Sequence, residues 1–242
     1  MRKEMLPVIP EFTGTEYNAV GFWLSAILLA LLIALAGYIA GRSAAKRFGG
    51  KKATTALIFS SVALVTSAAL ICFFGVSATA IRGSVICIIM LYACTQDIKT
   101  RECDDFLSVM LGITGIVGKE PSELVKDIFA FAAILIIMLL SAAVTKNGIG
   151  GADVKFASAA VFVLGFVNTS AALIVGLLAA VIVNCIAKKK SFPLLPYLSP
   201  AFMLAYFIGK KEENQKNEEQ NSTWHCLYFA ESFNNLRLFT AH

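Results

Sequence analysis

Residues 19–40 read AVGFWLSAILLALLIALAGYIA, a run of 22 residues that contains no charged side chain. An α-helix needs about 20 consecutive apolar residues to cross the hydrocarbon core of a bilayer. The run therefore predicts a membrane-spanning helix. It is also longer than the apolar core of a secretory signal, which has about 7–15 residues, so we expect it to be retained as a span.

Further apolar runs follow along the chain. Those of sufficient or nearly sufficient length are Ala53–Val76, Ser77–Thr95, Asp127–Val144, Ser170–Ala187 and Leu194–Gly209. Two shorter runs, Phe106–Gly118 and Phe156–Val167, are compatible with short spans, broken helices or re-entrant segments. The sequence thus predicts an all-α fold, a polytopic membrane helical bundle of eight transmembrane segments, with six as the alternative.

The composition of the chain excludes a soluble protein. Of the 242 residues, 57% are hydrophobic and only 15% are charged, whereas ordinary soluble domains are about 25% charged. The same figures exclude a disordered or fibrous chain. The net charge of +5 comes from basic residues in short clusters between apolar runs, not from one basic face with interleaved aromatics. We therefore expect no nucleic-acid partner.

The six cysteines do not have the spacing of a metal or redox centre. They are Cys72, Cys87, Cys94, Cys103, Cys185 and Cys226, and no two of them form a Cys-x-x-Cys pair. Zinc ribbons and thioredoxin-type centres depend on that spacing. We therefore predict that the protein uses no metal ion and no cofactor.

The basic clusters indicate the orientation in the membrane, because cytoplasmic loops are enriched in Lys and Arg. The connection Gly41–Lys52 follows the first apolar run and carries Arg42, Lys46, Arg47, Lys51 and Lys52. We place this connection in the cytoplasm and predict a multi-pass protein of the cytoplasmic (inner) membrane. Arg82 lies near one end of its run, and we expect it to reach the opposite interface.

Two aspartates stand out because acidic residues are almost absent from the apolar part of the chain. Asp97 ends the third run in YACTQDIKTR (residues 92–101), and Asp153 follows the glycines of NGIGGADVK (residues 147–155). Charge at membrane depth is costly and marks a candidate functional site. The predicted topology brings both to the cytoplasmic interface. Two carboxylates held close share a proton, so one can activate water while the other acts as an acid, as in aspartic peptidases.

Each aspartate also has a purely structural interpretation. Asp97 would then be a solvated carboxylate paired with Lys99 or Arg101, and Asp153 would cap the helix that follows it. The spacing of the two residues alone does not decide between these interpretations and a catalytic pair.

The sequence also allows other partners for Asp97 and another function for the protein. Asp104 and Asp105 are rival partners for Asp97, although a helix cap suffices to explain them. A proton- or cation-coupled membrane transporter would use Asp97 and Asp153 to bind its ion near broken helices. Such a transporter is expected to have inverted repeats, and the hydropathy shows none.

Three short stretches carry a resemblance to a known family. DIKTRECDD (residues 97–105) has an Asp followed by basic residues, GIGGADVK (residues 148–155) is a Gly-rich loop that ends in Asp-x-Lys, and PLLPY (residues 193–197) contains two prolines. Together they resemble the two aspartate motifs and a late segment of the type IV prepilin peptidases, over roughly residues 80–209. The resemblance implies that Asp97 and Asp153 are the catalytic aspartates.

The resemblance also implies a function. It is that of a membrane aspartic endopeptidase that removes basic leader peptides from type IV prepilin-like proteins at the cytoplasmic face. Its partners would be prepilin or pseudopilin-like substrates and membrane lipids. Bifunctional members of the family carry an insert with two Cys-x-x-Cys pairs between their first two spans. The connection Gly41–Lys52 has no Cys, so we expect no zinc-binding methylation insert.

The chain departs from the family's motifs at two places, and both carboxylates remain. The family's Ile-Pro step is Cys103-Asp104 here, and the Gly before the second aspartate is Ala152. Lys155 stands at the family's Lys position, where it would lower the pKa of a neighbouring carboxylate, hold a lipid phosphate or anchor the helix at the interface.

The resemblance and the composition together predict three parts of the chain. Residues 1–76 form an N-terminal segment with two transmembrane helices, and residues 77–209 form a peptidase-like membrane core. Residues 210–242 form a polar C-terminal tail, because the composition changes abruptly after Gly209.

Overall fold

The computed structural model describes residues 19–101, 103–144, 150–187, 193–212 and 215. These residues form eight helices and no strand, which confirms the predicted all-α fold. The helices are α1 (Ala19–Phe48), α2 (Lys52–Phe74), α3 (Ala78–Thr100), α4 (Asp105–Ile116), α5 (Pro121–Val144), α6 (Gly151–Ala159), α7 (Val161–Ala187) and a final helix over residues 195–212. The chain divides into two units, Met1–Tyr206 and Phe207–His242, and the contacts below lie within the first.

Five of these helices are long and apolar enough to cross a membrane. They are Gly21–Phe48, Lys52–Phe74, Ala78–Thr100, Pro121–Val144 and Val161–Ile186. α4 has 12 residues and is about 18 Å long, whereas the hydrocarbon core is about 30 Å thick. The predicted multi-pass, helical character is therefore confirmed, and the number of spans stays a prediction.

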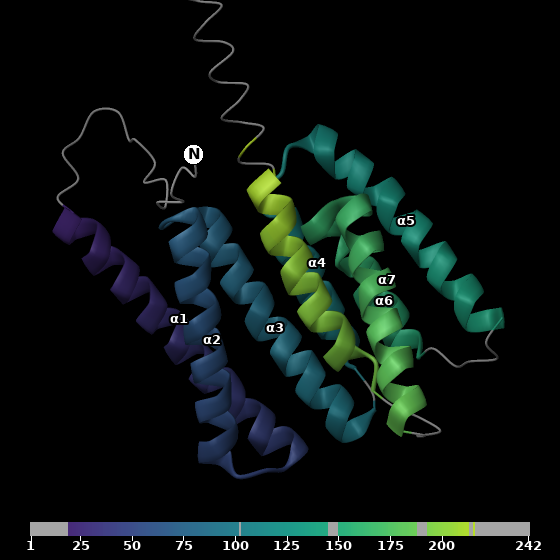
Figure 1. Cartoon of the computed structure of the whole chain (residues 1–242), viewed down its shortest axis with the longest axis horizontal. Coiled ribbons are helices and arrows are strands. Elements are labelled where there is room, and N and C mark those ends of the chain that lie inside the picture. Colours follow the sequence, from purple (N-terminus) through teal and green to yellow (C-terminus); the bar gives the residue numbers. More distant parts are fainter. Residues whose placement is uncertain (1–18, 102, 145–149, 188–192, 213–214, 216–242) are drawn as a thin grey trace, which may run out of the picture. The chain divides into compact units, whose positions relative to one another are not determined.

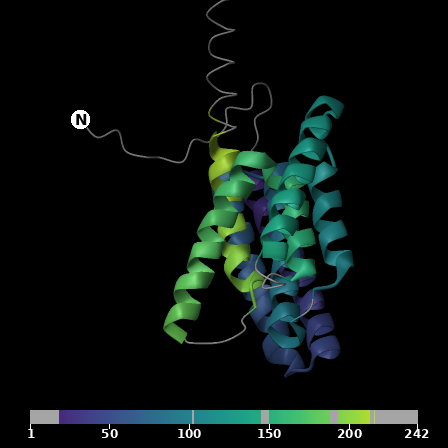
Figure 2. The same ribbon diagram turned by 90° about the vertical axis from the view of Figure 1, so that its right-hand side faces the viewer.

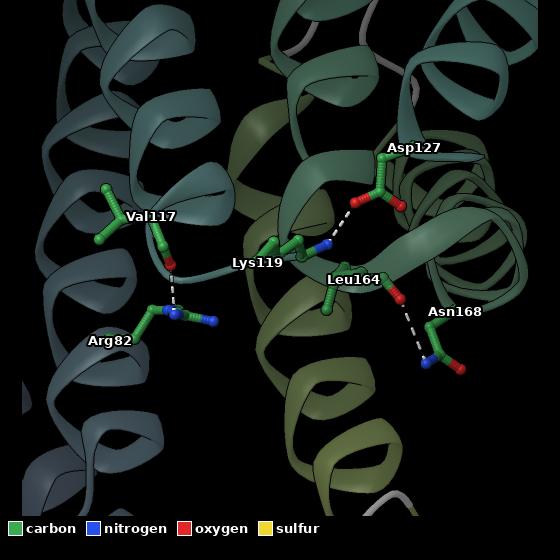
Figure 3. Close-up of polar contacts among 6 residues, drawn as sticks. All are labelled: Arg82, Val117, Lys119, Asp127, Leu164 and Asn168. Atoms are coloured by element: carbon green, nitrogen blue, oxygen red, sulfur yellow. Dashed lines mark hydrogen bonds and ion pairs between the residues drawn. The ribbon is translucent and has the colours of Figure 1, made fainter. Parts of the chain in front are cut away.

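The chain around α6 and α7 differs from the prediction. The sequence predicts one short segment over Phe156–Val167, but the structure divides this stretch between the end of α6 and the start of α7. Inside α7, Gly165 has a φ of 74°, which interrupts the helix and which residues with a side chain rarely adopt. The Nδ2 of Asn168 donates a hydrogen bond of 3.3 Å to the Leu164 carbonyl beside the interruption (Figure 3). Hydropathy does not detect such a break because both sides of it are apolar.

Two views at right angles show the long helices of the first unit running side by side along a broadly common direction (Figures 1 and 2). α1 packs on α2 and α3, and α7 packs on α4 and α5. The α1–α2 contact is close because Gly37 and Gly41 face α2. A Cβ at Gly41 would lie 2.7 Å from the Ala56 Cα, and one at Gly37 would lie 2.8 Å from the Ala63 Cβ. Small residues at this spacing allow membrane helices to approach closely.

Polar contacts hold the connection from α4 to α5 (Figure 3). Arg82 of α3 donates from its Nη2 to the carbonyl of Val117, directly after α4. Lys119, in the same connection, forms a largely buried ion pair with Asp127 of α5. The two cations thus tie this connection to the neighbouring helices, and the charge of Asp127 is neutralised by Lys119.

Candidate active site

Asp97 lies in the last turn of α3 and is 6% exposed. Its Oδ2 accepts a hydrogen bond of 3.0 Å from the backbone N–H of Leu195, at the start of the final helix. The backbone N–H of Leu194 also acts on this carboxylate and favours its charged form. α3 ends at Thr100, and the next residue, Arg101, has a φ of 57° and donates its N–H to the Asp97 carbonyl at 3.0 Å. Asp97 is therefore a buried carboxylate held by the backbone of a distant segment, and not a solvated one.

Asp153 lies in the first turn of α6. Gly150 occupies the N-cap position, so Asp153 is the third residue of the helix, and its interpretation as the cap is wrong. The backbone N–H of Gly150, at the N-cap position, acts on the Asp153 carboxylate and favours its charged form. A Cβ at Gly150 would lie 3.1 Å from Oδ2 of Asp153. A glycine at position 150 therefore avoids a steric contact with the Asp153 carboxylate.

The two carboxylates lie close enough for their charges to act on each other. The pKa of Asp153 is raised to about 6, chiefly by burial and further by the negative charge of Asp97, while the hydrogen bond from Gly150 lowers it. The pKa of the Cys103 thiol is raised to about 12 by burial and by the charges of Asp153, Asp97 and Asp104. The structure thus brings Asp97, Asp153 and Cys103 together, and the thiol stays protonated and is a poor nucleophile.

In the part of the chain that the structure describes, Asp97 and Asp153 differ from the neighbouring aspartates in that they form no ion pair. Three other aspartates of the described chain form ion pairs: Asp104 with Arg47, Asp105 with Lys155, and Asp127 with Lys119. Among the described residues, Asp97 and Asp153 form no ion pair. The positive charge of Arg101 acts on Asp97 without forming an ion pair with it. A buried carboxylate outside an ion pair is costly, and such groups are concentrated at functional sites.

The rival partners of Asp97 are engaged elsewhere. Asp104 lies 2.8 Å from Nη1 of Arg47, at the end of α1. Both carboxylate oxygens of Asp105 lie 2.8 Å from Nζ of Lys155. Lys155 is therefore used to link α6 to α4, at an exposed ion pair, and its charge is directed to Asp105.

Both departures from the family's motifs are accommodated by the backbone. Ala152 lies within α6 and does not have a positive φ. Asp104, at the position of the family's Pro, has φ −65° and ψ 135° and occupies the N-cap position of α4. A proline has the same φ, so the conformation of this step is retained without its ring.

Two contributions to the site were not predicted from the sequence. The first is the start of the final helix. Pro193 and Pro196 favour a helix start there, and PLLPY resembles a late segment of the family, but neither signal places this segment beside Asp97. The second is the environment one turn earlier on α3, where Sγ of Cys94 donates to Oγ of Ser199 at 3.0 Å. Gln96, beside Asp97, is 3% exposed, and its Oε1 has no hydrogen-bond partner among the described residues.

The described residues contain no group of three or more His, Cys, Asp or Glu side chains placed to hold a metal ion. The groups that Asp97 and Asp153 bring to the site are a pair of coupled carboxylates. Such a pair titrates jointly and can accept one proton while donating another.

Replacement of Asp153 by Asn is expected to stabilise the protein at neutral pH. The pKa of this carboxyl is about 6 in the folded chain and near 3.8 otherwise, so the folded state binds more protons between these values. The contribution of Asp153 to stability is therefore present below about pH 4 and is lost as the pH rises through 6. The thermal unfolding midpoint of Asp153→Asn in detergent should exceed that of the wild type at pH 7 and approach it at pH 4. Asp105→Asn is the control, and a difference independent of pH would contradict the prediction.

The model of the type IV leader peptidase family matches residues 84–187. The predicted resemblance to this family is thereby confirmed, and the family indicates a peptidase. The matched range includes Asp97 and Asp153, and it ends before the start of the final helix at Leu195. No curated protein and no solved structure matches the chain.

Proposed function

We propose that the protein is a membrane aspartic endopeptidase that removes basic leader peptides from type IV prepilin-like proteins at the cytoplasmic face of the inner membrane. One observation carries the proposal. The carboxylates of Asp97, which is buried, and Asp153, which is half-buried, act on each other and, among the described residues, form no ion pair, unlike the neighbouring aspartates. The match of residues 84–187 to a leader peptidase family supports it.

The chemistry proposed for the pair needs only one shared proton. The ionised carboxylate takes a proton from water while the water oxygen attacks the carbonyl carbon of the scissile peptide bond. The protonated carboxyl donates its proton to the carbonyl oxygen. When the C–N bond breaks, one hydroxyl of the intermediate returns its proton to the pair, and the other carboxyl gives its proton to the leaving amine. The pair ends the cycle with one proton, as it began.

The place of the pair suits a substrate whose apolar helix lies in the membrane. Asp97 ends a long apolar helix, and the same end of the bundle carries the basic connection from α1 to α2, because Arg47 contacts Asp104 there. On the predicted topology this end faces the cytoplasm. A basic leader would be drawn to the anionic lipid surface, which places the bond before the pilin helix near the carboxylates.

The proposed enzyme has no zinc-binding insert between its first two membrane helices. α1 ends at Phe48 and α2 begins at Lys52, so residues 49–51 form the whole connection. A transporter that binds its ion at the same aspartates is the alternative, and the family match favours the peptidase over it.

The proposal is tested by producing the wild-type protein together with a prepilin-like substrate that carries a basic leader. The leader should be removed in the membrane fraction, and the mature substrate should migrate faster than the precursor. A substrate with its scissile bond altered serves as control. If precursor accumulates unchanged beside well-expressed wild-type protein, the proposed function is wrong.

Replacement of Gly150 by Ala is expected to lower kcat about tenfold, because a Cβ there lies 3.1 Å from Oδ2 of Asp153 and displaces the carboxylate. The φ of Gly150 is −67°, so alanine does not strain the backbone. Gly151→Ala is the matched control, since a Cβ at Gly151 meets no atom within 4 Å. Initial rates of leader removal at saturating substrate measure the difference, and equal rates for both variants would refute the role of Gly150.

A further inference from the structure

The start of the final helix joins the site from outside the residues that match the family. Tyr197 and Leu198 both donate their N–H groups to the Leu194 carbonyl, at 3.0 and 3.2 Å. Leu194 is thus the N-cap residue and Leu195 the first residue of the helix. The N–H groups of the first helical turn have no partner within their own helix. That of Leu195 is therefore available, and it donates to Oδ2 of Asp97 at 3.0 Å.

The helix start is also fixed against α3 by contacts that do not involve the carboxylate. Cys94 lies one turn before Asp97, and its Sγ contacts Oγ of Ser199 at 3.0 Å and the Leu195 carbonyl at 3.5 Å. The side chains of Leu195 and Leu198 are fully buried. The N–H of Leu195 is consequently held in place by packing, and its direction does not depend on the carboxylate that it contacts.

We propose that Leu195 is a positioning residue of the peptidase, whose backbone N–H orients Asp97 and favours its ionised form, so that the shared proton rests on Asp153. The inference rests on the proposed function. A hydrogen bond donated to a carboxylate stabilises the charged form, and a fixed donor also selects which oxygen remains free for water. The final helix thereby becomes part of the catalytic apparatus and not only a part of the bundle.

Other charged and titratable groups lie on the elements that carry the pair and the donor of Leu195. They are Arg101 and Cys94 on α3, Cys103 and Asp104 before α4, Asp105 on α4, Lys155 on α6 and Tyr197 on the final helix. Asp104, Asp105 and Lys155 are engaged in ion pairs of their own. The backbone N–H groups of Leu194 and Leu195 differ from all of these because neither can titrate.

Proline at position 195 tests the inference, because it removes the N–H and is favoured at the first position of a helix. Proline also restricts the preceding residue to an extended conformation, which suits an N-cap. Leu195→Ala is the matched control, since it shortens the same buried side chain and keeps the N–H. Relative to Leu195→Ala, kcat of Leu195→Pro should fall about 10- to 100-fold, with KM changed less than about threefold.

The pH profile separates positioning from a general loss of structure. Without the donor, the ionised form is less favoured, so the acidic limb of the rate profile should move to higher pH in Leu195→Pro and stay in place in Leu195→Ala. Leu194→Pro, compared with Leu194→Ala, removes the second donor and should move the limb in the same direction.

The outcomes distinguish this inference from the proposed function. If the wild type removes no leader, the proposed function fails. If the wild type is active and both Pro variants have the pH profiles of their Ala controls, only the inference fails. If neither Pro variant accumulates in the membrane while both Ala variants do, the inference is likewise overturned, because the N–H groups would then serve folding and not Asp97.

Discussion

Asp97→Asn and Asp153→Asn are each expected to abolish leader removal, lowering kcat/KM by at least about a thousandfold. Asn has nearly the shape of Asp and can neither take a proton from water nor share one. Replacing either member leaves the other carboxylate without its coupled partner, so the acid and base roles cannot both be filled. Because the two residues act as a unit, the double variant should be about as inactive as each single one.

The control variants for this experiment lie beside the pair. Asp104→Asn and Asp105→Asn remove carboxylates that form ion pairs with Arg47 and Lys155. Both pairs are partly exposed, so each loss should cost at most about 1 kcal/mol of stability. Leader removal should stay within a few-fold of the wild type in both. The assignment of Asp97 and Asp153 would be refuted if either of their Asn variants, present in the membrane at normal amounts, processed the precursor fully.

Gly115→Ala is expected to destabilise the fold by about 3 kcal/mol, the upper part of the range for overpacked sites. A Cβ at Gly115 of α4 would overlap the carbonyl carbon of Phe162 and lie 2.5 Å from its carbonyl oxygen. Both atoms belong to the backbone at the start of α7, so a rotamer change cannot relieve the contact. α4 and α7 would have to separate, with loss of the packing between them.

The same helix provides the control for Gly115. A Cβ at Gly112 would lie 3.7 Å from Cδ2 of Phe162, an ordinary contact, so Gly112→Ala should leave the stability unchanged or raise it slightly. Thermal unfolding in one detergent measures both variants, and the midpoint of Gly115→Ala should be several degrees lower. Equal midpoints would show that the close approach of α4 and α7 is not needed for stability.

The membrane-spanning helices could be predicted from the sequence because each depends on its own residues. A run such as residues 19–40 is transferred from water to lipid whatever the rest of the chain does, so its composition is sufficient evidence. The helix over the same residues, α1, begins at Ala19 and extends to Phe48, further than the apolar run. The extension carries Lys46 and Arg47, basic residues that favour the end of a helix.

The interruption of α7 and the environment of each aspartate could not be predicted from the sequence. Gly165 resembles any other glycine in an apolar helix until the packing requires a φ of 74°. Asp153 has the residue type of a helix cap, and only the backbone shows that Gly150 occupies the N-cap position.

The sequence alone thus predicted that this protein lies in a membrane, that it is helical, and that Asp97 and Asp153 are its candidate site residues. Lipid makes charge costly, so a rare acidic residue is informative even before folding is considered. Only the tertiary structure decided which carboxylates stay without an ion pair. Asp104 forms an ion pair with Arg47, Asp105 with Lys155 and Asp127 with Lys119. Asp97 instead accepts a hydrogen bond from the N–H of Leu195. These contacts join distant helices, and their partners are set by packing, which no local pattern of residues encodes.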